Sequence, residues 1–525
     1  MNLILFVLAL AIFAFQNALL LEISTEIVYT GSGPVRGLST ANSKQYLGIA
    51  YGTAKRFEAP TPLPPWRRPV KATRVGPMCY QDCPTSPPHL CLTQMSEDCL
   101  SLNVYVPRGS PGGSGFAVMV FIHGGDFLSY SGSSPLFNGD VFVKKGNVIL
   151  VTLNYRLGAF GFLPRVVDGE VVGGNYGLLD QQLALKWVHD NIRAFGGDNS
   201  KITIFGQSAG AQSVCVHLVS PSVANYFQRA IIQSSPIALP FRNATEAERQ
   251  VHLFARQLGC NVRDAHCFQS KSAAEVLHAQ RSTPKDQISD NSAMQFQAWG
   301  PVIDGKNISG NLLSILATTS IDKDVIIGTT SDEGIAYVYG AVPHGIPNFL
   351  FSFFLNMFIP NSSAIANHYT VRGDARTALS EVITDFMFLC PSKLFADILS
   401  SSKNVWFYRF EQPLSIDAWG RATHCVNKAC HGVDLPFLYD TPRLIGYEVT
   451  SGDEKLSSTM IGYWTNFAKY GNPNSMGTLP KWPKYQKKFP TKQKVMVFKE
   501  PRVMVKEAER KKCAAINRQG YQIVG

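Results

Sequence analysis

The sequence predicts an α/β protein in which a large, mostly parallel central sheet is flanked by helices within a single domain. Short apolar runs alternate along the chain with helical patterns, and this alternation is typical of α/β folds. The runs are apolar throughout, as expected for parallel strands that are buried on both faces. The runs that we assign to strands are Phe116–Ile122, Asn147–Leu153, Ile202–Phe205, Asp324–Gly328 and Asn404–Phe410.

A single domain is expected even though the chain has 525 residues, 45% of which are hydrophobic. That length would allow several domains. However, the sequence contains no fixed-period repeat, no low-complexity tract and no long polar linker. One large core is therefore the simpler prediction.

The N-terminal segment carries no charge over its first 21 residues. Its core, Leu3–Phe15, fits the apolar region of a secretory signal peptide and is shorter than a membrane span. We expect a signal peptide over residues 1–18 and a mature domain over residues 19–525. An uncleaved membrane anchor remains the alternative, because no Lys or Arg precedes Arg36 and no clean A-x-A site is present.

Two helices and one turn complete the outline of the fold. Apolar residues recur at helical spacing over Gly177–Phe195, where Gly196 and Gly197 end the pattern, and again over Asp453–Pro473. The glycines of Gly31–Gly37 faintly resemble a dinucleotide-binding loop. Their spacing and Pro34 indicate a hairpin turn instead.

The cysteines indicate an oxidising compartment, because most of the 11 lie in close local pairs. Zinc is the competing explanation, but the sequence has neither C-x2-C nor H-E-x-x-H, so we expect no metal and no cofactor. Three N-glycosylation acceptors, Asn243, Asn307 and Asn361, fit the same compartment. We therefore expect a glycoprotein that is secreted or retained in the lumen of the secretory pathway.

The net charge of +11 comes from dispersed basic residues, and only 17% of all residues are charged. A solvated surface is the expected reason, and attraction to an anionic membrane or matrix stays open. A nucleic-acid partner is not expected for a secreted chain. The sequence does not indicate an oligomeric state.

The stretch Ile202–Ala211, "ITIFGQSAGA", contains a G-x-S-x-G motif between a predicted strand and a predicted helix. The glycines either make a tight turn only, or hold Ser208 in a strained and exposed position as a nucleophile. A serine nucleophile needs a base to take its proton and an acid to orient that base. In strand–elbow–helix hydrolases these follow in the order Ser, Asp or Glu, His.

The chain resembles the type-B carboxylesterases, the cholinesterase-like branch of the α/β-hydrolases. The resemblance runs from Tyr46–Pro60 to Ile461–Asn474, and its most specific stretches are "SEDCLSLNVYVP" (Ser96–Pro107), "NYRLGAFGFL" (Asn154–Leu163) and Gly174–Gly210. It implies a serine hydrolase that cleaves small-molecule carboxylic esters through an acyl-enzyme.

The same resemblance implies the partners of Ser208. Glu333 in "DEG" matches the acid of the family, with Asp332 as the adjacent alternative. His431 in "HGVDLPF" matches the base, and His424 is the nearest competitor.

The oxyanion donors are expected from Ala209, which follows the nucleophile, and from Gly125 and Asp126 in "HGGDF". Each such donor is worth about 3–4 kcal/mol in the transition state. Relatives usually carry glycine or alanine in place of Asp126, whose carboxylate would oppose an oxyanion unless it points away. Gln207 is a second departure, since most relatives have Glu there, although juvenile-hormone-esterase-like members share "GQSAG".

Other features are carried over from the family by position. The resemblance implies disulfides Cys79–Cys99, Cys260–Cys267 and Cys390–Cys513, and the remaining Cys83–Cys91 and Cys425–Cys430 would pair locally. Cys215 would stay a buried free thiol. Glu97 and Arg156 occupy the positions of a buried salt bridge of the family.

The substrate is expected to be a general carboxylic ester, with a lipid-like or bulky acyl group, rather than acetylcholine. A choline site usually needs a tryptophan face, and the interval Cys79–Cys99 has no Trp. Gln295 and Gln297 stand where cholinesterases carry paired phenylalanines. The alternative function is an inactive or weakly active relative that serves as a binding or adhesion protein.

Overall fold

A computed structural model gives the structure of the chain, and it describes residues 23–83, 91–92, 94–359, 362–415, 422–445, 448–474, 479–486, 493–500, 504–507 and 511–521. The expected signal peptide, residues 1–18, lies outside the described residues. No helix within the described ranges is long and apolar enough to cross a bilayer.

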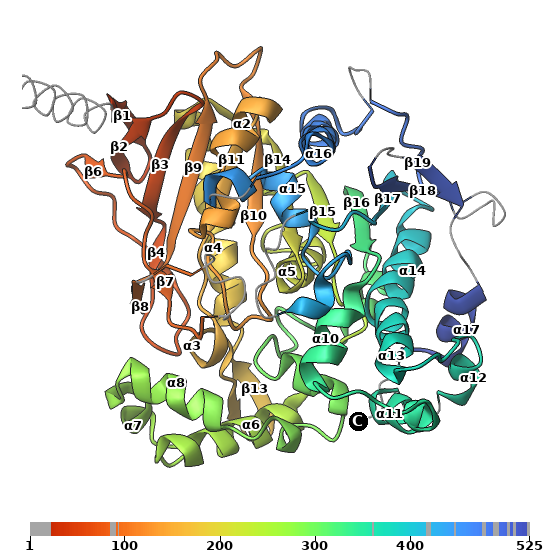
Figure 1. Cartoon of the computed structure of the whole chain (residues 1–525). Coiled ribbons are helices and arrows are strands. Elements are labelled where there is room, and N and C mark those ends of the chain that lie inside the picture. The colour runs from red at the N-terminus through yellow and green to blue at the C-terminus, as the bar shows by residue number, and fades with distance from the viewer. Residues whose placement is uncertain are drawn as a thin grey trace, which may run out of the picture.

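A single 13-stranded sheet organises the described part of the chain (Figure 1). Its central neighbours are parallel, whereas its N-terminal edge and the final pair are antiparallel. In spatial order the strands are β1 (Ile23–Thr30), β2 (Gly33–Ser39), β3 (Ser43–Ala50), β9 (Ser101–Pro107), β11 (Ile149–Leu153), β10 (Phe116–Ile122), β14 (Gly197–Gln207), β15 (Arg229–Gln233), β16 (Asp324–Thr330), β17 (Val405–Phe410), β18 (Lys494–Phe498) and β19 (Met504–Glu507), with β6 (Val70–Lys71) beside β2.

Helices cover both faces of this sheet. One face packs on α4 (Tyr176–Asn191), α5 (Ala209–Leu218) and α14 (Cys390–Leu399), and the other packs on α2 (Asp140–Gly146), α15 (Asp434–Tyr439) and α16 (Ser451–Tyr470). Strand β10 shows why its run is apolar throughout. Val118 and Val120 enter the first core, whereas Met119 and Phe121 enter the second. The predicted α/β class with a largely parallel sheet is thus confirmed.

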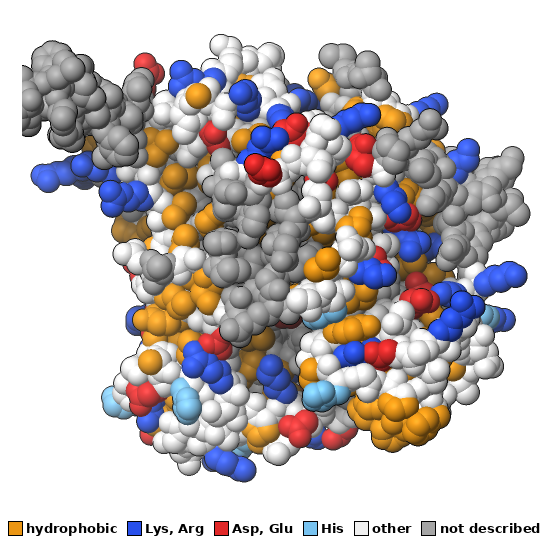
Figure 2. Space-filling view, in the orientation of Figure 1, with side chains coloured by type: hydrophobic (Ala, Val, Ile, Leu, Met, Phe, Trp, Pro, Cys, Tyr) orange, Lys and Arg blue, Asp and Glu red, His pale blue; other side chains and the backbone are white. Residues whose placement is uncertain are grey.

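The remaining helices lie at the ends of the sheet. They include α3 (Gly158–Phe162), α6 (Ala244–Leu258), α8 (Ala273–Ser282), α10 (Glu333–Ala341), α11 (Phe351–Phe358), α13 (Ala375–Ile383) and α17 (Lys511–Gln519). Helix α11 and the residues before it expose Phe349 (81%), Phe353 (61%) and Met357 (44%), and Figure 2 shows a compact group of hydrophobic side chains at the corner where Figure 1 places α11.

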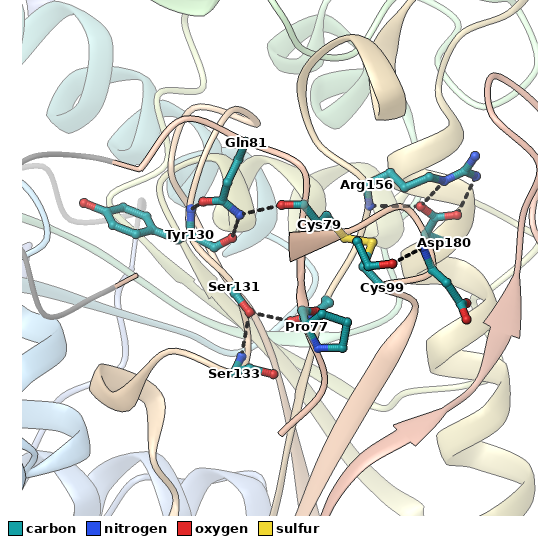
Figure 3. The surroundings of a disulfide bond; sticks show 12 residues. Pro77, Cys79, Gln81, Cys99, Tyr130, Ser131, Ser133, Arg156 and Asp180 are labelled. Atoms are coloured by element: carbon teal, nitrogen blue, oxygen red, sulfur yellow. Dashed lines mark hydrogen bonds and ion pairs between the residues drawn. A yellow bond between two sulfur atoms is a disulfide. The ribbon is translucent and has the colours of Figure 1, made fainter. Parts of the chain in front are cut away.

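All five expected disulfides are present, and Cys215 is a buried free thiol. The Cys79–Cys99 bridge lies beside Gln81, whose side-chain amide donates to the Tyr130 carbonyl at 2.8 Å and accepts from the Tyr130 amide at 2.6 Å (Figure 3). Because Tyr130 follows the predicted oxyanion loop, this bridged segment braces that loop.

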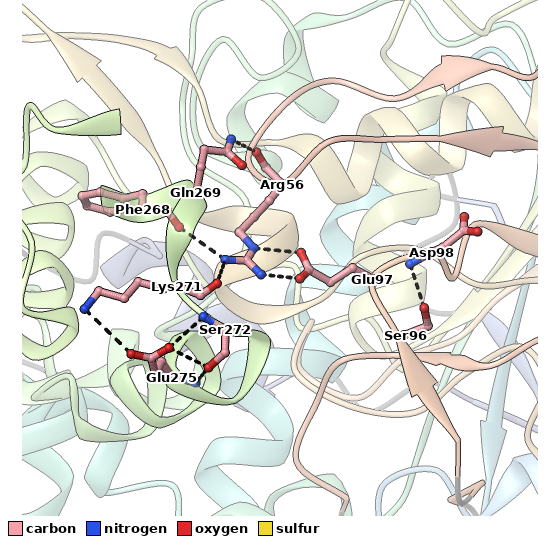
Figure 4. A network of polar contacts seen from close by, with 9 residues as sticks. All are labelled: Arg56, Ser96, Glu97, Asp98, Phe268, Gln269, Lys271, Ser272 and Glu275. Carbon is pink, nitrogen blue, oxygen red and sulfur yellow. Dashed lines mark hydrogen bonds and ion pairs between the residues drawn. The ribbon is translucent and has the colours of Figure 1, made fainter. Parts of the chain in front are cut away.

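The expected Glu97–Arg156 salt bridge is wrong. Glu97 forms a two-pronged ion pair with Arg56, which also donates to carbonyls of the segment before α8 (Figure 4). Arg156 instead pairs with the buried Asp180 of α4, with its Nη2 2.7 Å from Oδ1. The sequence positions identify the charged residues, but they do not show which arginine pairs with which carboxylate.

The glycosylation sites differ in their surroundings. Asn243 is exposed and caps α6, where its Oδ1 accepts from the Glu246 amide at 2.9 Å. Asn307 is half-buried and its amide nitrogen donates to Asp304 at 2.8 Å. Asn361 lies outside the described residues.

The turn at Gly31–Gly37 is the predicted hairpin, between β1 and β2.

Candidate active site

The predicted sites gather where the central parallel strands end. Strand pairing sets Ile122 opposite Gly206, and Gln233 opposite both Gln207 and Gly328. The segments that follow β10, β14 and β16 therefore leave the sheet side by side. In open parallel sheets this carboxyl edge is where ligands bind.

Ser208 forms a sharp elbow between β14 and α5. Its backbone has φ 59° and ψ −125°, a conformation that a residue with a side chain rarely adopts. The Ser208 amide donates to the Gln233 carbonyl at 2.9 Å, which fixes the turn to the neighbouring strand. The side chain is 3% exposed.

The two glycines of the elbow are required by close packing. A Cβ atom on Gly210 would lie 2.0 Å from the Ile122 carbonyl oxygen, and one on Gly206 would lie 2.5 Å from the Gly210 carbonyl. Both obstacles are backbone atoms, which cannot rotate away. The helix after the elbow can approach the sheet only because these positions lack side chains.

We expect Gly210→Ala to lower the free energy of unfolding by about 1–3 kcal/mol, because the new methyl group overpacks against backbone. Urea denaturation followed by circular dichroism measures the change. Gly340→Ala is the matched control, since a Cβ there meets open space within α10, and it should be neutral or stabilising. A Gly210→Ala protein as stable as the wild type would contradict this reading.

Glu333 and His431 are in direct contact. Glu333 begins α10 just after β16 and is fully buried, and its Oε2 lies 2.5 Å from Nδ1 of His431. Its other oxygen accepts from the Thr330 amide at 2.7 Å. With both carboxylate oxygens engaged, the acid can hold the imidazole in one orientation.

Asp332 and His424, the alternatives to Glu333 and His431 that the sequence left open, make other contacts. The Asp332 carboxylate accepts from the Ala429 amide at 3.1 Å, so it holds the backbone of the loop that carries His431. The His424 ring stacks on Tyr339, with ring centroids 5.2 Å apart. The Cys425–Cys430 disulfide closes the loop immediately before His431.

The surroundings of His431 favour its charged form. Burial opposes the charge, but the attraction and hydrogen bond of Glu333, followed by the charges of Asp126 and Asp434, raise the pKa of His431 above its usual value. Asp434 lies on α15, where burial raises the pKa of its carboxyl to about 6.

The Nε2 atom of His431 contacts Gln207 and not Ser208. The Gln207 amide nitrogen lies 3.1 Å from it, and no hydrogen bond joins Ser208 to His431 among the described residues. Burial raises the pKa of the nearby Tyr337 well above its usual value, and the Ser208 side chain opposes that rise.

The predicted oxyanion loop lies against the elbow. A Cβ atom on Gly124 would lie 2.9 Å from the Ser208 Cβ. Gly125 and Asp126 both have positive φ, 101° and 55°, which turns the backbone sharply. Within the described chain, the amides of Gly125, Asp126 and Ala209 have no protein acceptor, so they are free to donate to a ligand.

Asp126 is half-buried, and its carboxylate interacts electrostatically with His431. Burial raises its pKa, and the charge of His431 opposes that rise. In turn the Asp126 charge raises the pKa of Tyr130 and of Tyr337. Asp126 therefore lies close enough to these groups for their charges to interact.

An aromatic wall flanks His431, and the sequence did not reveal it. The rings of Tyr337 and Phe388 lie 5.4 Å and 5.1 Å from the His431 ring, and Phe296 lies 5.8 Å from Tyr337. One signal was available, because Tyr337 stands four residues after Glu333 on the same helix and so shares its face. Of the expected pocket residues, Gln295 is exposed, and Gln297 is buried against Gln212 at 2.6 Å.

The described residues contain no group of three or more His, Cys, Asp or Glu side chains that could hold a metal ion.

Similarity to known proteins identifies the family to which this fold and the elbow at Ser208 belong. The model of the Carboxylesterase family matches residues 24–516, and the chain belongs to this family. Among curated proteins it is similar to the Crystal protein of Dictyostelium discoideum, with 34% identity over 466 residues that cover 86% of this chain and 83% of that protein. It is equally similar to the Cholinesterase of Mus musculus, with 34% identity over 505 residues that cover 87% and 81%.

A solved structure of a thermophilic PNB esterase superimposes with a TM-score of 0.80 and 30% identity, covering 94% of this chain and 99% of the other. The α/β-hydrolase fold expected from the sequence is thereby confirmed.

Proposed function

We propose that the protein is a serine hydrolase that cleaves carboxylic esters through an acyl-enzyme. Ser208 is the nucleophile, His431 the general base and Glu333 the residue that orients and stabilises the imidazolium. The observation that supports this most is the Glu333–His431 contact of 2.5 Å beside the strained elbow of Ser208.

The reaction proceeds in two similar halves. Ser208 Oγ attacks the ester carbonyl while His431 Nε2 takes its proton, and the developing negative charge accepts hydrogen bonds from Gly125, Asp126 and Ala209. His431 then gives the proton to the departing alcohol. Water repeats the sequence on the acyl-enzyme and releases the acid.

The substrate that we propose is an ester with a bulky or lipid-like apolar group. The rings of Phe296, Tyr337 and Phe388 form an apolar surface beside the base, and aromatic side chains gain most from burying apolar ligand area.

We also propose a secreted glycoprotein. The five disulfides support an oxidising compartment, and Asn243 has the exposure that a glycan needs. Removal of N-glycans from protein secreted by cultured cells should lower its apparent mass.

Pre-steady-state hydrolysis of p-nitrophenyl butyrate tests the catalytic proposal. An acyl-enzyme mechanism in which deacylation is slower releases a burst of p-nitrophenol that approaches one equivalent of enzyme. The alternative function, a catalytically weak or inactive binding protein, predicts neither burst nor turnover. It gains some support from the relative named Crystal protein, a name that describes no activity.

We expect kcat/KM to fall as the pH drops through a midpoint above 6.5, the usual pKa of histidine. The base acts only in its neutral form, and the pKa of His431 is raised, so protonation removes activity at a higher pH than for an isolated histidine. A pH–rate profile of kcat/KM measures the midpoint. A midpoint below 6.5 would contradict the proposed pairing of His431 with Glu333.

A further inference from the structure

Gln207 occupies the space between the base and the oxyanion loop. It is 4% exposed, and its amide nitrogen lies 3.1 Å from His431 Nε2. A Cβ atom on Gly124 would lie 3.0 Å from its Oε1, and one on Gly432 would lie 3.7 Å from its Nε2. Because Gly124 and Gly432 have no side chains, the space between them can hold the side chain of Gln207.

The chemistry of the contact assigns the proton on His431. An amide nitrogen only donates, so His431 Nε2 must accept and carries no proton. The proton of the neutral imidazole is then on Nδ1, where it is donated to Glu333 at 2.5 Å. The two contacts on opposite sides of the ring select the same tautomer, which is the one that a general base requires.

The contact also competes with the nucleophile. Nε2 has one lone pair, and Gln207 uses it, whereas no hydrogen bond joins Ser208 to Nε2 within the described ranges. For catalysis Ser208 must replace Gln207 at Nε2. Once His431 is protonated at Nε2, a half-turn of the amide about its last torsion would present Oε1, which accepts from that proton.

We propose that Gln207 is a positioning residue that holds His431 as the neutral, Nδ1-protonated base in the free enzyme and yields Nε2 to Ser208 when the ester binds. The proposal rests on the proposed function. A neutral side chain at this position keeps the base from being charged prematurely, whereas a carboxylate at 3.1 Å would accept from Nε2–H and favour the imidazolium.

Gln207→Glu tests this directly, because it changes charge and hydrogen-bonding sense with little change in shape. The ionisable groups that face His431 are otherwise unchanged: Glu333 and Tyr337 from α10, Asp126 from the oxyanion loop and Asp434 from α15. An added opposite charge at this range raises the pKa of a histidine by about 1–3 units. The acid limb of the pH profile of kcat/KM should move upward by that amount, with activity recovered at high pH.

Gln94→Glu is the matched control, since Gln94 is exposed, and it should leave the midpoint at the wild-type value. Gln207→Met removes the donor without adding charge, and it should allow the Nε2-protonated tautomer to appear. A purely structural role of Gln207 predicts lower activity at every pH with no shift of the midpoint, and that result would overturn the proposal.

Nitrogen NMR of protein labelled with ¹⁵N-histidine separates this proposal from the proposed function, because it reads the tautomer and the pKa of His431 without turnover. Wild-type protein should show Nδ1–H and an unprotonated Nε2, and Gln207→Glu should show a raised pKa, even if no ester is cleaved. An Nε2-protonated neutral ring in the wild type, or an unchanged pKa in Gln207→Glu, would overturn the role of Gln207 and leave the role of Ser208 untouched.

Discussion

Ser208→Ala should lower kcat for p-nitrophenyl esters by about 10⁴–10⁶-fold, because it removes the only atom that the mechanism places to attack the carbonyl. The residual rate should come from substrate binding and the oxyanion donors. Steady-state kinetics with enzyme of verified fold measures the loss. The burst of p-nitrophenol should disappear as well.

Ser213→Ala provides the control for this loss. Ser213 is also a buried serine on α5, but its hydroxyl donates to the Ala209 carbonyl at 3.0 Å and takes no part in the proposed chemistry. It should retain a kcat within a few-fold of the wild type. Equal rates in Ser208→Ala and the wild type would remove Ser208 from the mechanism.

Glu333→Gln should lower kcat by about 10³–10⁴-fold, comparable to the loss of the acid in other serine triads. The amide keeps the shape of the side chain but can donate to Nδ1, which would place the histidine proton on Nε2 and block the base. Removing this negative charge should also lower the pKa of His431, so the acid limb of the remaining activity should move to lower pH.

Asp332→Asn is the comparison that the chain itself offers, because the two carboxylates are adjacent. The Asp332 carboxylate accepts from the Ala429 amide and from the Ser331 hydroxyl and does not contact His431 by a hydrogen bond, so its loss should cost far less activity. A larger loss in Asp332→Asn than in Glu333→Gln would reverse the proposed assignment of the acid.

Much of this architecture follows from local sequence patterns. The strand β10 was predicted with its exact bounds, and the elbow could be located because a strand, two glycines and a helix occur in order. An apolar run predicts a strand that is buried on both faces. The residues that define such a run, or an elbow, are close together in the sequence, so both can be recognised without knowledge of the fold. The cysteine pairs came instead from the resemblance to the carboxylesterases, which also implied Cys390–Cys513, two residues 123 positions apart.

What the sequence did not reveal depends on contacts between distant segments. Arg56 reaches Glu97, and Arg156 reaches Asp180, because the fold brings these charges together; the motifs that contain Glu97 and Arg156 carry no such information. Gln207 is a similar case. Its sequence neighbours announce an elbow, yet its contact is His431, 224 positions away.

Covalent labelling tests the central claim most directly. An organophosphate that phosphorylates activated serines, followed by proteolysis and mass spectrometry, should give one adduct per chain, on the peptide that contains Ser208. The adduct should be absent in Ser208→Ala and much slower to form in Glu333→Gln. No adduct on Ser208 in folded wild-type protein, or an adduct on another serine that accounts for the lost activity, would contradict the account.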